Sequence, residues 1–67
     1  MFKFNIGDKV KIIELHGFEP QVYKINKVLT IRKRQFKQPF DLEPIYWFGD
    51  KRNISTVGLY ESQLSVI

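Results

Sequence analysis

The sequence predicts an all-β protein, a small five-stranded barrel with one short helical turn before the last strand. The chain contains no alanine and is rich in β-branched and aromatic residues, which favour pleated, half-buried surfaces. Its apolar residues do not recur with the spacing of an amphipathic helix over any window of useful length. Short apolar runs instead alternate with clusters of Gly, Pro, Asn and Asp, which favour turns.

The first two strands are expected at 9–14 and 22–36. A tight turn at Gly7-Asp8 leads the chain into the first strand, in which polar and apolar residues alternate. A loop punctuated by Gly and Pro follows it at 15–20. The apolar residues of the second strand change face partway along its length. A bulge or sharp bend near Asn26-Lys27 is therefore predicted, because small barrels need such bends to close.

Three shorter strands are expected in the second half of the chain, at 45–48, 55–59 and 65–67. The first of them is apolar on both faces, as in a central strand. The turn-forming residues 49–53 should close a hairpin between it and the next strand. One helical turn is expected at 60–64. Five short strands with such a turn before the last are the plan of an SH3-like barrel.

Three short patterns carry a family resemblance: Phe4-x-x-Gly7-Asp8-x-Val10, Tyr46-Trp47-Phe48 and Tyr60-x-x-x-Leu64. They resemble small bacterial and phage SH3-like proteins and, loosely, the YodC-like family of uncharacterised small proteins. The chain departs from that family at 15–20, where the family has a Ser-Gly-Gly-Pro segment. The resemblance implies an SH3-like fold and no enzymatic activity. Within that fold, Phe4, Val10, Tyr60 and Leu64 are expected to close the barrel.

Length and composition limit the class of protein. The 67 residues leave room for one domain, 1–67. The absence of cysteine excludes a disulfide framework and cysteine-ligated zinc, and fits a reducing compartment. The first residues lack the continuous apolar stretch of a secretory signal, and no apolar run approaches the ~20 residues that span a bilayer. We therefore expect a cytoplasmic protein without a membrane partner, either a monomer or a small homo-oligomer.

Residues that could support catalysis are sparse. His16 is expected to be an exposed loop histidine rather than a general base. Asp41 and Glu43 are two positions apart, and a solvated acidic loop is a simpler interpretation than a catalytic carboxylate pair. One histidine without cysteine offers no metal-ligand set, and the glycines form no phosphate-binding motif. Neither enzymatic activity nor a cofactor or metal is expected.

Positive charge is concentrated in one part of the sequence. The net charge is +4, and residues 20–40 hold six basic side chains and no acid. The sharpest candidate site is Arg32, Lys33, Arg34, Phe36 and Lys37, predicted to contact nucleic acid or an acidic protein surface. Basic side chains bind phosphates by releasing counterions, and a nearby aromatic ring can stack on a base. The alternative is a solvated loop whose lysines keep an edge strand from aggregating.

Aromatic residues form the second candidate site. Phe18, Tyr46 and Trp47 are predicted as an aromatic groove of the kind that holds proline-rich or methylated peptides. The alternative is that these rings belong to the core, an expectation that applies more to Trp47 than to Tyr46. The preferred hypothesis is a non-enzymatic nucleic-acid-binding module. The alternatives are a protein-interaction module, such as a phage-type modulator of a host protein, acting through this groove or a strand edge, and a self-associating structural subunit.

Overall fold

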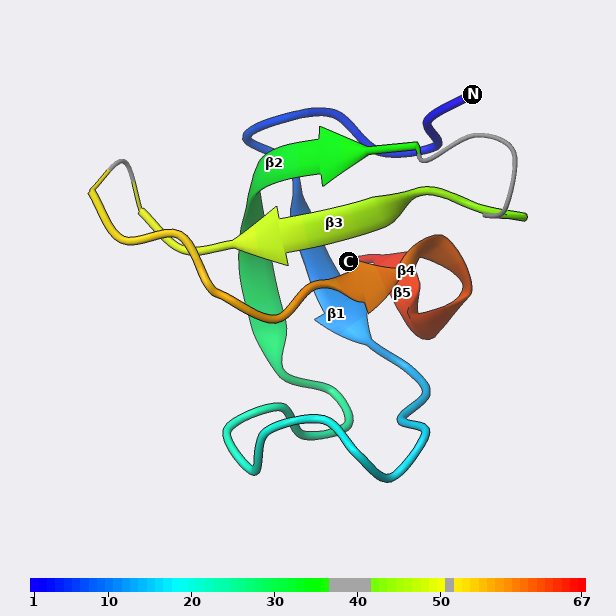
Figure 1. Ribbon diagram of the computed structural model, residues 1–67, viewed down its shortest axis with the longest axis vertical. Helices are drawn as coiled ribbons and strands as arrows, with labels where there is room; N and C mark the ends of the chain where they lie inside the picture. The colour runs from blue at the N-terminus through cyan, green and yellow to red at the C-terminus, as the bar shows by residue number, and fades with distance from the viewer. Residues whose placement is uncertain (37–41, 51) are drawn as a thin grey trace.

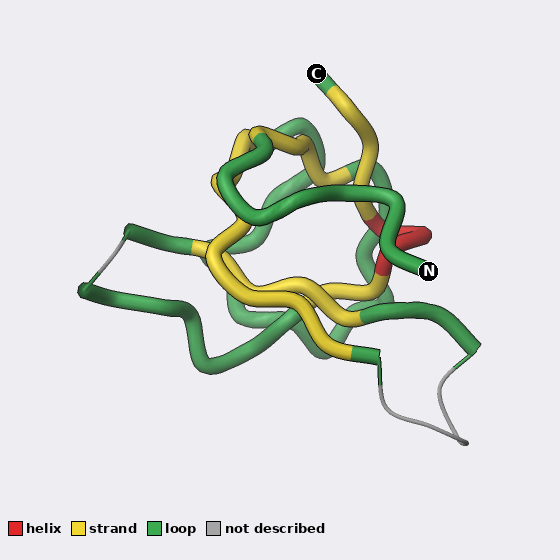
Figure 2. Tube along the Cα trace, turned by 90° about the horizontal axis from the view of Figure 1, so that it is seen from above, coloured by secondary structure: helices red, strands yellow, loops and turns green. Residues whose placement is uncertain are grey.

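A computed structural model describes residues 1–36, 42–50 and 52–67, which form a five-stranded antiparallel sheet curved round one core (Figures 1 and 2). The strands are β1 (Lys9–Ile12), β2 (Val28–Gln35), β3 (Ile45–Phe48), β4 (Leu59–Tyr60) and β5 (Leu64–Val66). Their order in the sheet is β4-β3-β2-β1-β5, and the 3-10 turn η1 (Glu61–Gln63) links β4 to β5. This arrangement confirms the predicted fold class. No helix in the described segments is long and apolar enough to cross a membrane.

The predicted Gly7-Asp8 turn leads into β1. Gly7 has a φ of 93°, a conformation that glycine adopts without steric cost. The Asp8 carboxylate accepts the N–H of Asn5 at 2.9 Å and so closes the turn. The N–H of Gly7 donates to the Ile31 carbonyl at 2.7 Å, and the N–H of Ile31 donates to the Asp8 carbonyl at 2.9 Å. The turn that precedes β1 is therefore hydrogen-bonded to β2.

β2 belongs to both halves of the sheet and bends between them (Figure 1). Its first half pairs with β1 and its second half with β3, and the pairing with β3 shifts register at Arg32, between Ile31 and Lys33. The predicted bulge near Asn26-Lys27 is wrong in position. Those residues form a turn before β2, in which Asn26 has a φ of 70° and the Lys27 N–H bonds locally. β2 therefore begins at 28 rather than at 22.

Other strand boundaries also differ from those predicted. The turn after β3 forms, since the Asp50 carboxylate accepts the N–H groups of Arg52 and Asn53, each at 2.8 Å. After a single bridge between Gly49 and Ile54, however, the chain leaves β3. It returns only at β4, which is shorter and later than the predicted strand 55–59. β1 ends two residues early, and β5 begins one residue early.

The core lies inside the curved sheet and is mostly aliphatic and aromatic. Of the residues predicted to close the barrel, Tyr60 is the exception: its side chain faces outward and is 39% exposed, because its neighbour Leu59 takes the inward position of β4. The other three are buried as predicted. The buried apolar residues are Phe4, Val10, Ile12, Tyr23, Ile31, Tyr46, Phe48, Leu59 and Leu64.

Candidate binding surface

The outer face of β2 and β3 presents one basic residue of the predicted site beside an aromatic ring. Lys33 and Trp47 are direct partners across the two strands, so their side chains stand on the same side of the sheet. The Lys33 ammonium nitrogen lies 4.8 Å from the centroid of the Trp47 ring, a cation–π geometry. Gln35 and Ile45 are the next pair on this face.

Gly58 lets Trp47 lie close to the backbone that precedes β4. A Cβ atom on Gly58 would be 2.9 Å from Cε2 of Trp47 and 2.6 Å from Cγ2 of Ile45. Trp47 is thereby half-buried. The expectation that Trp47 belongs to the core more than Tyr46 is wrong, because Tyr46 is the fully buried one of the two. All four residues of β3 are apolar or aromatic, so their pattern could not show which alternate pair faces inward.

Arg34 points to the opposite side of the sheet from Lys33. It pairs with the buried Tyr46, and one guanidinium nitrogen donates to the Phe4 carbonyl at 2.8 Å and to Oδ1 of Asn5 at 3.1 Å. The guanidinium also lies over the ring of Phe2, 4.4 Å from its centroid. Arg34 therefore fastens the N-terminal segment across the end of the core, a structural task that a sequence-local charge pattern does not reveal.

The remaining residues of the predicted basic site do not join Lys33 in one patch. Arg32 lies at the bulge, and its Nε donates to the Gly49 carbonyl at 3.0 Å, toward the turn after β3. Phe36 is half-buried just beyond the end of β2. Lys37 lies outside the described residues. The described side chains of this stretch thus take three directions: outward, across the N-terminal segment and toward the turn.

Tyr46 uses its hydroxyl inside the molecule. The hydroxyl accepts the backbone N–H groups of Lys3 and Phe4, each at 3.2 Å, and donates to the Glu61 carboxylate at 2.5 Å. Burial, together with the bond to Glu61, raises the pKa of Tyr46 to about 12. This side chain joins β3, η1 and the N-terminal segment, and it does not reach the outer surface.

A different aromatic row lies on the surface, where the loop after β1 meets β4. The ring of His16 lies 6.1 Å from that of Phe18 and 6.4 Å from that of Tyr60, measured between centroids. Phe18 is 84% exposed. The predicted groove of Phe18, Tyr46 and Trp47 is not assembled, because Tyr46 faces the core. Phe18 instead joins His16 and Tyr60, and we call these three residues the aromatic row.

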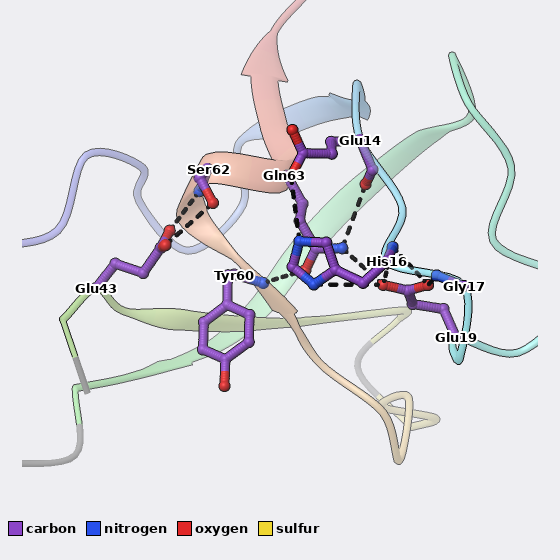
Figure 3. Close-up of polar contacts among 8 residues, drawn as sticks. All are labelled: Glu14, His16, Gly17, Glu19, Glu43, Tyr60, Ser62 and Gln63. Carbon is purple, nitrogen blue, oxygen red and sulfur yellow. Dashed lines mark hydrogen bonds and ion pairs between the residues drawn. The ribbon is translucent and has the colours of Figure 1, made fainter. Parts of the chain in front are cut away.

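A buried polar cluster fixes the loop that carries this row (Figure 3). The Glu19 carboxylate accepts the N–H groups of His16 at 2.8 Å and Gly17 at 2.9 Å, and the side-chain amide of Gln63 at 2.8 Å. These donors, led by the His16 N–H, lower the pKa of Glu19 to about 2. The Gln63 amide also donates to the Glu14 carbonyl, and its oxygen accepts the N–H of Tyr60 at 2.9 Å.

This cluster was not predicted from the sequence, although one local signal for it is present. A glutamine three residues after the residue that starts a helical turn is the reciprocal half of a capping box. Gln63 stands in that relation to Tyr60. The partnership of Gln63 with Glu19, 44 residues away, has no local signal.

The hydrogen-bond donors to the described carboxylates are groups other than lysine and arginine side chains. Glu43 accepts the N–H and the hydroxyl of Ser62, and Glu61 accepts the Lys3 N–H at 2.8 Å (Figure 3 shows the Glu43 pair). Within the described residues, the only ion-pair contacts are those of His16, with Glu14 at 3.1 Å and with Glu19 at 3.9 Å. The acidic groups thus mainly accept hydrogen bonds that hold turns and loops in place. The lysines and arginines of the described residues are not neutralised by ion pairs.

One open apolar pocket lies on the side of the core near the turn after β3. It has a volume of about 240 Å³, and its apolar walls come from Tyr23, Leu29, Phe48 and Ile54. Its lining contains no charged group. Across residues 1–36, 42–50 and 52–67, no three His, Asp or Glu side chains gather in a way that could hold a metal ion.

Comparison of the chain with protein-family models, with curated proteins and with solved structures finds no match. The resemblance to the YodC-like family therefore stays a prediction from the three short sequence patterns.

Proposed function

We propose that this chain is a non-enzymatic binding module whose preferred partner is nucleic acid. The contact surface is the outer face of β1, β2 and β3, with Lys33 beside Trp47 at its centre. This surface includes fewer residues than the site predicted from the sequence. Arg34 is left out because it bonds to the N-terminal segment, and Arg32 because it bonds to the turn after β3.

One observation carries the proposal: every charged side chain at the outward positions of these three strands is a lysine, and none is a carboxylate. On β1, Lys9 and Lys11 alternate with the buried Val10 and Ile12, and on β2 Lys33 takes the outward position after the bulge. A strand face of one charge sign attracts a polyanion and releases its counterions on binding. The ion-pair partners that would cancel this field are absent among the described residues.

The chemistry of the face favours phosphate contact over base reading. A lysine ammonium is a point charge that binds phosphate without demanding a fixed geometry. The exposed side of the Trp47 ring is occupied by Lys33, so a base would have to displace that lysine in order to stack. We therefore expect sequence-tolerant binding.

The test measures the affinity of the full chain for a labelled single strand and a labelled duplex over a series of salt concentrations. The logarithm of the affinity should fall linearly with the logarithm of salt, by roughly 0.7 per phosphate contact for the single strand and about 0.9 for the duplex. Lys33→Glu should weaken binding to all sequences alike and reduce the slope by about one contact.

The matched control is Lys24→Glu, which makes the same charge change in the exposed loop before β2. It should keep most of the affinity. An equal loss of affinity in both variants would show that binding responds to net charge alone, and it would contradict the proposed surface. Binding that does not depend on salt would remove nucleic acid as the partner.

A second candidate function, protein interaction, is favoured by a separate observation. The aromatic row of Phe18, His16 and Tyr60 is exposed and lies beside the acidic groups around η1, with Tyr60 next to Ile45 at the edge of the Lys33 face. Exposed aromatic rings on a small domain are typical of peptide-binding surfaces.

A further inference from the structure

We infer that the aromatic row and the carboxylate of Glu14 form a binding site for an arginine side chain of a partner polypeptide. The site goes beyond nucleic-acid binding and uses other residues, of which Tyr60 borders the Lys33 face through its pairing with Ile45. It consists of the rings of Phe18, His16 and Tyr60 together with the carboxylate of Glu14, which lies 3.1 Å from Nε2 of His16.

Several aromatic rings of this chain are paired with cations. Three rings outside the aromatic row each have a cation over them: Lys3 over Phe4, Lys33 over Trp47 and Arg34 over Phe2. No cation of the described residues lies over Phe18 or Tyr60. Those two rings are exposed to solvent. An aromatic face that carries no cation is a favourable place for a cation to bind.

The local charge also supports the site. Glu14, Glu19, Glu43 and Glu61 all lie within or beside η1 and the loop that packs on it. The other three accept hydrogen bonds from internal donors, whereas the Glu14 side chain is 60% exposed and, among the described residues, contacts only the ring of His16. Glu14 is therefore the carboxylate best placed to receive a donor from outside.

The rigidity of the site also favours binding. The loop 14–19 is held by the bonds of Glu19 to His16 and Gly17, and Gln63 ties that loop to Tyr60 (Figure 3). Ordering a mobile surface on binding costs free energy and lowers affinity, and a surface that is already ordered avoids this cost. The rings and the carboxylate are held in place by the fold.

These features favour arginine over lysine. The guanidinium group is planar, so one face can lie on an aromatic ring while its N–H edge donates two bonds to a carboxylate. Lysine offers no plane to stack on. A partner segment with an accessible arginine, in an extended conformation, therefore fits this surface.

The test is a titration of the isotope-labelled full chain with a short synthetic Gly/Ser peptide that contains one central arginine, followed by amide NMR shifts. Shifts should concentrate at residues 14–19 and at Tyr60. The same peptide with citrulline, a neutral isostere, should give none. Lysine in place of arginine should bind several-fold more weakly.

Two variants complete the test. Glu14→Gln should weaken arginine-peptide binding about tenfold, the loss expected for one charge-assisted bond. Phe18→Ser should weaken it by a similar factor, and neither exposed change should alter the fold. Lys33→Glu, which changes none of the four residues of the site, should bind the peptide as the unchanged chain does. Shifts that persist with citrulline, an affinity that Glu14→Gln leaves unchanged, or the lack of shifts with arginine would each overturn the site.

Discussion

Gln63 is the buried polar side chain on which three segments depend. It is 1% exposed, yet its amide group contacts the backbone of Tyr60 and Glu14 and the carboxylate of Glu19. A buried polar group that loses its partner costs more than the bond itself was worth, because the group left behind stays desolvated. Gln63 is therefore expected to matter for stability far beyond its size.

We predict that Gln63→Met lowers the free energy of unfolding by about 2–4 kcal/mol, since methionine fills the same space and removes the bonds that Gln63 makes to three polar partners. Urea denaturation measures this. Gln35→Met, the same change on the exposed face of β2, should cost less than about 0.5 kcal/mol. Equal small effects at both positions would show that the Gln63 bonds contribute nothing to stability.

Gly58 is the second residue whose identity the packing requires. An added Cβ would meet two side chains, Ile45 and Trp47, and lie 2.9 Å from the carbonyl oxygen of Tyr46. Gly58→Ala should therefore destabilise the protein by about 1–3 kcal/mol. It should also shift the emission of Trp47, the one tryptophan of the chain. Thr56→Ala, an exposed change in the same connection, is the control, and unchanged emission in Gly58→Ala would contradict the described contact.

The role of a residue could be predicted from the sequence where the residue acts on its neighbours, but not where its partner is far away along the chain. Gly7 and Asp8 form the predicted turn because a positive φ and a short side-chain bond are properties of adjacent residues. The roles of Arg34 and Gln63 depend on partners about 30 and 44 residues away. No pattern of neighbours specifies those partners.

Among the elements, the long loop after β1 is clasped onto η1 through an ionised Glu19. Its pKa of about 2 lies below the ordinary value of 4.5, because backbone and amide donors stabilise the charged form. A carboxyl group with a depressed folded-state pKa stabilises the fold fully above its unfolded value. That stabilisation is lost as pH falls through the window from about 4.5 to about 2.

We predict that stability declines with falling pH across this window and that Glu19→Gln removes much of the decline. Urea midpoints measured from neutral pH downward check this. The variant should be less stable at neutral pH and converge toward the unchanged chain as pH falls to about 2 and below, where Glu19 of the folded chain takes up its proton. The lowered pKa of Asp50 adds to the decline in both proteins and so leaves the difference between them intact. If the urea midpoints of the two proteins fell in parallel with pH, the proposed role of the Glu19 carboxylate would be contradicted.

The elements also show why strand existence was easier to predict than strand limits. The alternation in β1 and the apolar run in β3 identify strands by composition. The bulge at Arg32 has no glycine or turn residue to mark it, because it arises where β2 leaves β1 and joins β3. That bulge decides which of Arg32, Lys33 and Arg34 faces outward, and so the candidate site could not be resolved from sequence alone.

Across the whole molecule, charge is divided between two regions. Carboxylates gather around η1, where they accept bonds from backbone, hydroxyl and amide donors. The charged residues at the outward positions of β1 and β2 are lysines: Lys9, Lys11 and Lys33. This separation gives a small protein two chemically distinct groups of surface residues, one suited to phosphates and one to a cation. A net charge of +4 leaves the lysine face dominant at long range.

Trp47 offers the most direct test of the central claim that the lysine face binds nucleic acid. It lies under Lys33, so a strand held by that lysine must change the surroundings of the ring. Titration of the full chain with an unlabelled single-stranded oligonucleotide at low salt should alter Trp47 emission in a saturable way. Added salt should reverse the change, and Lys33→Glu should move it to higher oligonucleotide concentrations. Constant emission throughout the titration, at oligonucleotide concentrations that saturate other basic domains, would contradict the claim.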